Sequence, residues 1–213
     1  FAMFAALIVY TAAGSKLTSV THMLLALFVG AILIPVYGHW ATSGHFITTN
    51  QGWLQGAGFV DQAGAITINT VAGWFAFIIC WKMGKAHTDS TEKVNNDPVY
   101  SSSATLLLWL SWMGFTTGTL PISNDQISSV MLNAGLAASA GGLTAFLQYV
   151  FFSADKSAIA RGLGGFVSGL VAIAACAQSV TFVEAAFIGA VAGSLQNIAY
   201  RVLRKWFLTQ AWQ

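Results

Sequence analysis

Long stretches without a charged residue constrain this chain more than any other feature. They are separated by single charges or small charge clusters and cover residues 17–60, 62–81, 98–124, 126–154, 162–183 and 185–200. A helix needs about 20 apolar residues to cross the hydrocarbon core of a bilayer, and each stretch comes close to that length. Only 8% of the 213 residues are charged, whereas soluble domains carry roughly 25%. The sequence therefore predicts an integral membrane protein.

The same stretches predict a single all-helical membrane domain over residues 1–213. We expect a partial helix at residues 1–15, followed by six fuller helices near residues 17–38, 61–82, 102–120, 126–152, 158–178 and 183–205. The first apolar run is too short to span comfortably, and it begins with Phe1 instead of Met. We therefore expect a fragment that starts inside a helix.

The basic residues predict an orientation in the membrane. If successive loops alternate between the two sides, one side receives all nine basic residues, namely Lys16, Lys82, Lys85, Lys93, Lys156, Arg161, Arg201, Arg204 and Lys205. The other side receives residues 39–60, 121–125 and 179–184, which contain no Lys or Arg. Because basic loops remain in the cytoplasm, we expect residues 82–93, Lys156 and residues 201–205 to be cytoplasmic, in a plasma or inner membrane. The net charge of +2 is small, so we expect no nucleic-acid partner.

Small residues recur at four-residue spacing late in the chain. Gly165 with Gly169, and Gly189 with Gly193, are examples. Such spacing lets helix backbones approach closely in lipid. We interpret these glycines as packing residues without chemistry.

Two polar residues stand out in "VDQAGAITINTVAGW", residues 60–74. In a helix from residue 61, Asp61 lies at the external mouth and Asn69 about 12 Å deeper, on a neighbouring face. Polar groups at that depth face the protein interior or a water-filled path. Asn69 could equally be a hydrogen-bonding group between helices, and Asp61 an ordinary helix N-cap. Residue types and spacing leave these alternatives open.

An aromatic pair follows near the external end of the helix expected at residues 102–120. Trp112 and Phe115 are three residues apart and therefore share a helix face. Packing is the usual role of such a pair. Its functional alternative is cation binding, because an aromatic face attracts a partly desolvated cation.

The sequence has few features that would indicate a metal site, a bound cofactor or an enzyme. His22, His39, His45 and His87 lack metal-ligand spacing and are paired with no nucleophile. A redox subunit holding haem or chlorophyll on His22 or His39 is the weakest of the alternatives. We find no phosphate loop, dinucleotide fingerprint or hydrolase motif, and we expect neither an enzyme nor a bound cofactor or metal.

Several segments together resemble the ammonium transporter family, the Amt/Mep/Rh proteins. They are "IPVYGHW" (34–40), "NQGWLQGAGFVDQAGAITINTVAGW" (50–74), "LLWLSWMGFTTGT" (107–119), "MLNAGLAASAGGL" (131–143) and "AAFIGAVAG" (185–193). The likeness is collinear and covers nearly the whole chain. Each motif alone matches the family only loosely, but the order of the motifs along the chain is fairly specific to the family.

The resemblance implies a fold and an assembly. Family members have eleven helices and form homotrimers in which each subunit carries its own pore, so this chain would run from within the third helix to the ninth. The implied substrate is ammonium or ammonia. The external loop also resembles that of Amt domains fused to signalling modules, which implies a signalling or complex partner on the cytoplasmic side as an alternative role.

Position by position, the resemblance also implies residue roles. Asp61 would match the acid that shapes the external ammonium site from behind. Trp112 would line the recruitment site, and Thr119 would supply its hydroxyl. Phe1 and Phe115 would match the two stacked rings that close the pore below that site.

Two departures from the family pattern bear on conduction. An aromatic of the recruitment site falls at Thr42, which weakens cation binding. Asn69 stands where the family has its first pore histidine, eight residues after the acid. Imidazole titrates near neutral pH, whereas an amide only donates and accepts hydrogen bonds. The sequence therefore leaves two hypotheses, an ammonium channel or transporter with an altered pore, and a non-conducting sensor or structural subunit.

Overall fold

The computed structural model of this chain describes residues 1–14, 17–42, 52–83, 98–120, 125–152 and 158–209, apart from the side chains of Thr42 and residues 204–209. Its regular elements are all helical within these ranges. The chain divides into two compact units, Phe1–His87 and Thr88–Gln213. We describe each unit separately as unit 1 and unit 2.

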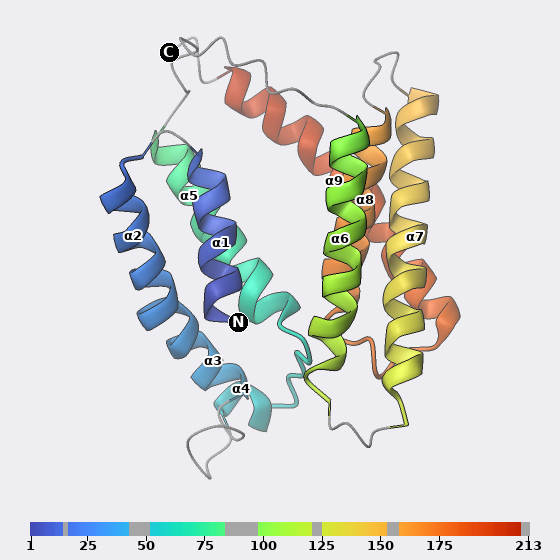
Figure 1. Ribbon diagram of the computed structural model, residues 1–213, viewed down its shortest axis with the longest axis horizontal. Coiled ribbons are helices and arrows are strands. Elements are labelled where there is room, and N and C mark those ends of the chain that lie inside the picture. Colours follow the sequence, from blue (N-terminus) through green and yellow to red (C-terminus); the bar gives the residue numbers. More distant parts are fainter. Residues whose placement is uncertain (15–16, 43–51, 84–97, 121–124, 153–157, 210–213) are drawn as a thin grey trace. The chain divides into compact units, whose positions relative to one another are not determined.

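Unit 1 contains helices that change type along their length. In chain order its elements are α1 (Ala2–Ala13), α2 (Ser19–Phe28), the π-helical segment η2 (Val29–Leu33), α3 (Ile34–Thr42), α4 (Trp53–Gly56), the π-helical segment η3 (Ala65–Thr70) and α5 (Val71–Met83). The elements α2, η2 and α3 follow one another as one long helix, and α1 packs against this helix and against α5 (Figure 1). The short helix α4 lies within residues 39–60, which were predicted to form an external loop without a helix.

Small residues let α1 sit at the centre of unit 1. Ala5, Val9 and Ala13 of α1 are almost fully buried. On the helices around it, the ring of Phe28 stacks on Phe75 with centroids 5.5 Å apart. Aromatic pairs at this separation add to the stabilisation from burial.

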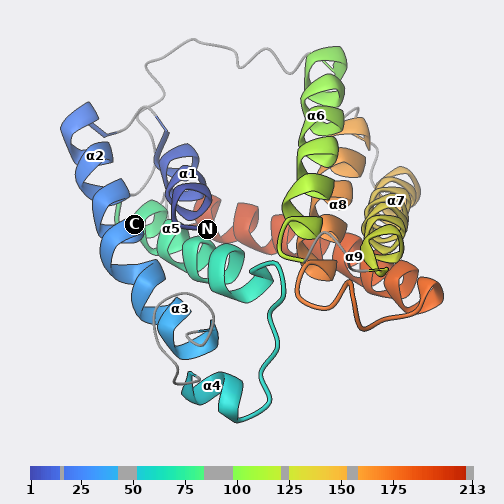
Figure 2. The same cartoon turned by 60° about the horizontal axis from the view of Figure 1, so that its bottom comes forward.

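Unit 2 is a bundle of four helices, α6 (Pro98–Thr117), α7 (Ile127–Phe152), α8 (Ala158–Ile173) and α9 (Phe182–Thr209). The helices α7, α8 and α9 pack against one another, and α6 packs on α7 and α8 (Figures 1 and 2). The predicted close approach at glycines is confirmed. A Cβ at Gly169 or at Gly189 would collide with the Ala137 carbonyl oxygen.

Buried amides connect the helices of unit 2. Asn133 donates to the carbonyls of Ala177 and Val180 over 2.8 and 2.9 Å. Asn197 donates to the Ala145 carbonyl over 2.8 Å. Helix α8 ends at Ile173, earlier than the predicted 178, and turns follow it. The first of these amides satisfies carbonyls in that turn region, where the helix no longer can.

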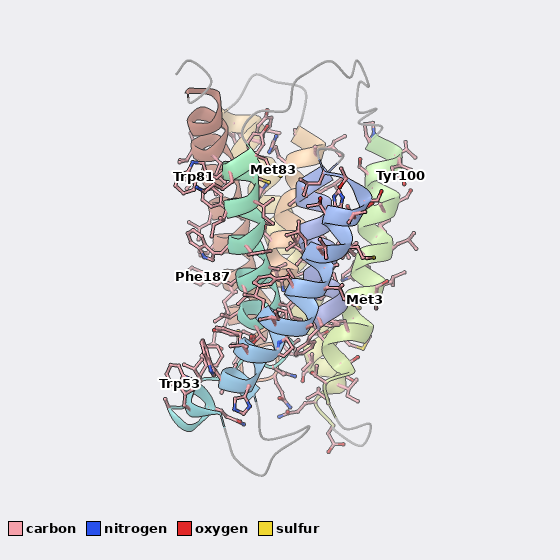
Figure 3. All side chains as sticks on the ribbon, turned by 90° about the vertical axis from the view of Figure 1, so that its left-hand side faces the viewer. Met3, Trp53, Trp81, Met83, Tyr100 and Phe187 are labelled. Atoms are coloured by element: carbon pink, nitrogen blue, oxygen red, sulfur yellow. The ribbon has the colours of Figure 1, made fainter. Side chains whose placement is uncertain are left out.

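The helices have the length and surface of membrane spans. Among the described residues, four helical stretches are long and apolar enough to cross a bilayer, at Ser19–Ala41, Ala65–Met83, Ile127–Phe152 and Phe182–Leu203, while α1 and α8 are shorter apolar helices. Large apolar side chains point outward in both units, among them Met3, Trp53, Trp81, Tyr100 and Phe187 (Figure 3). The predicted class, an all-α integral membrane protein, is confirmed.

Part of the predicted orientation falls outside the described residues. Lys16, Lys85, Lys93, Lys156, His45 and His87 lie there, as do the side chains of Thr42, Arg204 and Lys205. Lys82 is exposed near the end of α5, and Arg201 is exposed near the end of α9. Which side is cytoplasmic stays a prediction.

Candidate functional site

Asp61 caps the start of the helix that carries Asn69. The Asp61 side chain is only 5% exposed. Its Oδ2 accepts hydrogen bonds from the Ile66 and Thr67 amides, at 3.1 and 2.7 Å, and from the Thr67 hydroxyl at 2.7 Å. A carboxylate is stabilised there by the unpaired amides and by the helix dipole. Asp61 thus binds the amides of the helix start from outside the helix, while Gly64 occupies the N-cap position, so the alternative of an ordinary N-cap at Asp61 is corrected. A direct role toward ammonium stays a prediction.

Gly64 sets where this helix begins. Its φ of 77° lies in the left-handed region, which side chains disfavour. A Cβ at Gly64 would also approach the Ile68 side chain to 2.5 Å, and Ile68 is fully buried. The helix therefore begins at Ala65 rather than at residue 61. The expected 12 Å descent along a helix from Asp61 to Asn69 is corrected accordingly, since only about 6 Å of helical rise separate Ala65 from Asn69.

Asn69 lies in the π-helical segment and is half-buried. Both its backbone amide and its side-chain Nδ2 approach the Gly64 carbonyl, at 3.3 and 3.4 Å. π-helical turns are rare and occur frequently at functional sites. This side-chain contact is long for a hydrogen bond, so the amide can be drawn to another partner at small cost.

The aromatic pair of α6 is confirmed as a contact. The rings of Trp112 and Phe115 have centroids 5.8 Å apart and are tilted by 56°. Trp112 is only 3% exposed, while Phe115 is half-buried. The accessible π surface of the pair, of the kind that cations favour, therefore belongs mainly to Phe115.

Threonine hydroxyls follow this pair at the end of α6. Thr116 donates to the Trp112 carbonyl at 3.0 Å, and Thr117 donates to Met113 at 2.7 Å. Thr119, just beyond the helix, is exposed and donates to the Thr116 carbonyl at 2.8 Å. Of these bonds, only that of Thr119 reaches one of the last four carbonyls of the helix. The hydroxyl oxygen of Thr119 keeps its capacity to accept a hydrogen bond from a ligand.

The predicted site residues fall into both units. Asp61, Asn69 and Phe1 belong to unit 1, whereas Trp112, Phe115 and Thr119 belong to unit 2. Phe1 precedes α1 and is 45% exposed. Two predicted contacts would involve residues of both units, namely the stacking of Phe1 on Phe115 and the approach of Asp61 to Trp112. Both stay predictions.

The histidines do not form a metal site in the described part of the chain. His22 Nδ1 lies 3.1 Å from the Thr18 carbonyl, and its ring packs on Tyr10 with centroids 4.6 Å apart. His39 is exposed on α3. The described residues hold no group of three metal-ligating side chains.

Sequence reasoning missed some of the polar residues that organise the molecule. Thr67 holds the Asp61 carboxylate, while Asn133 and Asn197 join helices of unit 2. A signal was available for the two asparagines, because each is an amide within a long apolar run, as Asn69 is. The partner of Thr67 could be identified only from the turn at Gly64.

Comparison with known proteins assigns the family. The sequence profile described as the Ammonium Transporter Family matches residues 1–210. The chain belongs to this family. Ammonium transporter Amt2 of Archaeoglobus fulgidus is 27% identical over 96% of this chain, and a putative ammonium transporter of Synechocystis is 30% identical over 96%.

Solved structures of ammonium transporter family proteins share the fold. One described as "Sensor Amt Protein" superposes with a TM-score of 0.81 at 28% identity and covers 92% of this chain. Mep2 of Candida albicans superposes with a TM-score of 0.78 at 25% identity, again over 92% of this chain. The chain spans 46% and 39% of the two sequence relatives, and 50% and 44% of the two structures. It therefore corresponds to about half of a full-length family member.

Proposed function

We propose that this chain is the part of an ammonium-conducting membrane protein that holds its recruitment site and upper pore. It corresponds, as a single domain over residues 1–213, to the third through ninth helices of the family. The proposal is supported by the family assignment and carried by one observation, the Asp61 carboxylate capping the helix that presents Asn69. The protein would act as a homotrimer in a plasma or inner membrane, with its basic loops in the cytoplasm.

The recruitment step follows from the chemistry of α6. Ammonium has four N–H donors and no acceptor, so it needs a π face and an oxygen acceptor. Trp112 supplies a buried indole and Thr119 an exposed hydroxyl. The buried Asp61 adds negative charge without having to touch the ion. Phe1 and Phe115 would close the path below the recruited ion.

Asn69 would line the path below that gate. An amide offers a carbonyl oxygen to ammonium and an N–H to ammonia, and it does not titrate. The long contact to Gly64, at 3.4 Å, leaves its Nδ2 available to a passing molecule. Conduction past an amide would therefore proceed by exchange of hydrogen bonds, with no proton held on the side chain.

An ammonium-triggered current in liposomes tests the proposal. The full-length protein that contains this chain should give a current, and W112L should reduce it by about tenfold, as expected when a cation–π contact of about 1–2 kcal/mol is lost. The matched control is W74L, since Trp74 is 64% exposed on α5. Absence of current from full-length protein shown to be folded would remove the conduction proposal, and equal loss in both variants would remove Trp112 from the site.

A second function, ammonium sensing, is favoured by the residue at position 69 and by the similarity to "Sensor Amt Protein". In this alternative the site binds ammonium without passing it, and a partner on the cytoplasmic side responds. Calorimetry beside the current measurement separates the two functions. Binding without current supports sensing, whereas a robust current excludes a sensor that does not conduct.

A further inference from the structure

One arginine of unit 2 sits in an aromatic clamp that the proposed function does not use. The guanidinium carbon of Arg161 lies 3.2 Å from the Tyr200 ring centroid and 5.9 Å from that of Tyr149. Tyr149 belongs to α7, Arg161 to the first turn of α8 and Tyr200 to α9. The cation is therefore held in one place by three helices, which lowers the entropy lost when it binds a ligand.

The clamp satisfies the faces of the guanidinium and leaves its edge without an acceptor. Nε of Arg161 is enclosed and has no hydrogen-bond partner among the described residues. A guanidinium carries five N–H donors in a planar fork, a geometry that matches two oxygens of a phosphate. Because Nε is enclosed, an oxyanion would bind through the two terminal amino groups of the guanidinium.

No described acid of unit 2 lies near enough to neutralise this charge. Glu184 precedes Tyr200 by sixteen residues on α9, which is about 24 Å of helix. Asp125 precedes α7, and Tyr149 lies more than about 30 Å along that helix from its start. The exposed Arg201, next to Tyr200, adds a second positive charge at the same end of α9.

The depth of the clamp fits the headgroup layer of a bilayer. Tyr200 and Arg201 lie within the last four residues of the candidate span Phe182–Leu203. Tyrosine and arginine are both favoured at this level, where an amphipathic ring or a long cationic side chain reaches the lipid phosphates. Basic pockets between membrane helices on the cytoplasmic side recognise anionic headgroups.

We infer that Arg161, held between Tyr149 and Tyr200, binds the phosphate of an anionic phospholipid at the basic end of unit 2. Tyr200 keeps the guanidinium in place, and Arg201 adds attraction for the net negative headgroup. This inference does not depend on conduction or sensing. It concerns the lipid that surrounds the protein, and it holds for either function.

Native mass spectrometry of the purified chain with defined lipid tests the site. Phosphatidylglycerol should bind more tightly than phosphatidylcholine of the same acyl chains. R161Q should weaken phosphatidylglycerol binding by about fivefold and remove this preference, as expected for the loss of one basic residue at the membrane surface. R161K, which keeps the charge without the planar fork, and Y200L, which removes the clamp, should give intermediate losses.

Two control variants and one competing anion test whether the effect is specific to Arg161 and to lipid. K82Q removes an exposed basic residue at the end of α5 and should leave the lipid preference unchanged. D155N, at a position outside the described residues, should also leave the lipid preference unchanged. A gain in lipid affinity in D155N would mean that Asp155 already pairs with Arg161, and it would overturn the inference. Equal binding of the two lipids, or unaltered binding in folded R161Q, R161K and Y200L, would also overturn it. Displacement by millimolar inorganic phosphate would assign the site to a free anion instead of a lipid.

Discussion

Unit 1 and unit 2 differ in how their helices deal with polar groups and close contacts. In unit 2, α7 and α9 run for 26 and 28 residues, and α7 meets both α8 and α9 through glycines that face backbone carbonyls. In unit 1, the path from Ser19 to Thr42 changes from α to π and back, and α5 is preceded by a second π segment. Close glycine packing makes unit 2 a stiff scaffold, whereas the irregular part of unit 1 carries the polar candidates Asp61 and Asn69.

The difference teaches where the side chain that we propose to line the pore can be varied. Asn69 lies in a segment whose geometry is set by Asp61 and Gly64. The cap and the turn define the backbone, so the side chain at position 69 can change from one polar group to another while the helix start persists. We therefore expect packing residues of unit 2 to affect stability most, and Asn69 to affect function most.

The largest effect is expected at the contact between α7 and α9. Gly189→Ala places a methyl group against the Ala137 carbonyl oxygen, and backbone cannot move aside as a side chain can. Overpacking of this kind costs about 3 kcal/mol or more. Unfolding of the purified chain in mixed micelles, followed by circular dichroism, measures the change.

The matched control for this contact is Gly114→Ala on α6. No atom lies within 4 Å of a Cβ built there, so this variant should match the wild type or gain up to about 1 kcal/mol of helix stability. Equal midpoints for the Gly189 and Gly114 variants would contradict the account of α7 and α9.

A smaller effect is expected at the helix start in unit 1. Asp61→Ala removes the acceptor of two backbone amides and one hydroxyl. Leaving such buried donors unpaired costs about 1–3 kcal/mol. The same micelle titration should show this loss, while Asp125→Ala, at an exposed acid before α7, should change the midpoint little. A stable Asp61→Ala variant would show that the cap does not hold this turn.

The smallest effect on stability is expected when one threonine hydroxyl is removed from either unit. Thr67 donates to the Asp61 carboxylate at 2.7 Å, whereas the Thr144 hydroxyl has only neutral carbonyls in reach, that of Ala140 at 2.9 Å and those of Gly141 and Ala190 at 3.1 Å. Hydrogen bonds to carboxylates contribute about 1.5–3 kcal/mol and those between neutral groups about 0.5–1.5 kcal/mol. Thr67→Val should therefore destabilise the chain more than Thr144→Val. The reverse order would place the more important polar contact in unit 2.

The sequence allowed the main helices of unit 2 to be predicted closely. The expected helix at 126–152 appears as Ile127–Phe152, because an uncharged run between two acids leaves few alternatives in a membrane protein. The contact between Trp112 and Phe115 was also predictable, since residues three apart share a helix face.

The irregular parts of unit 1 could not be predicted in the same way. The segment η2 contains no proline or polar residue to mark it, and its π geometry accompanies packing against α1. The helix expected from residue 61 begins only at Ala65, with η3, because Gly64 is in the left-handed conformation. This is one of several conformations open to glycine. The clamp around Arg161 joins residues from three helices, so spacing along the chain gives no sign of it.

The central claim is that Asn69 lines a conducting path from a position that the cap defines. The most direct measurement is the ammonium-triggered current of Asn69→Ala relative to wild type in liposomes. Thr70→Ala is the matched control, because the Thr70 hydroxyl likewise bonds to a carbonyl five residues earlier, that of Ala65 at 3.3 Å. We predict a wild-type current that Asn69→Ala lowers by about tenfold, as loss of one or two hydrogen bonds to the permeant molecule would do, and that Thr70→Ala preserves. Equal currents in wild type and folded Asn69→Ala would contradict the claim.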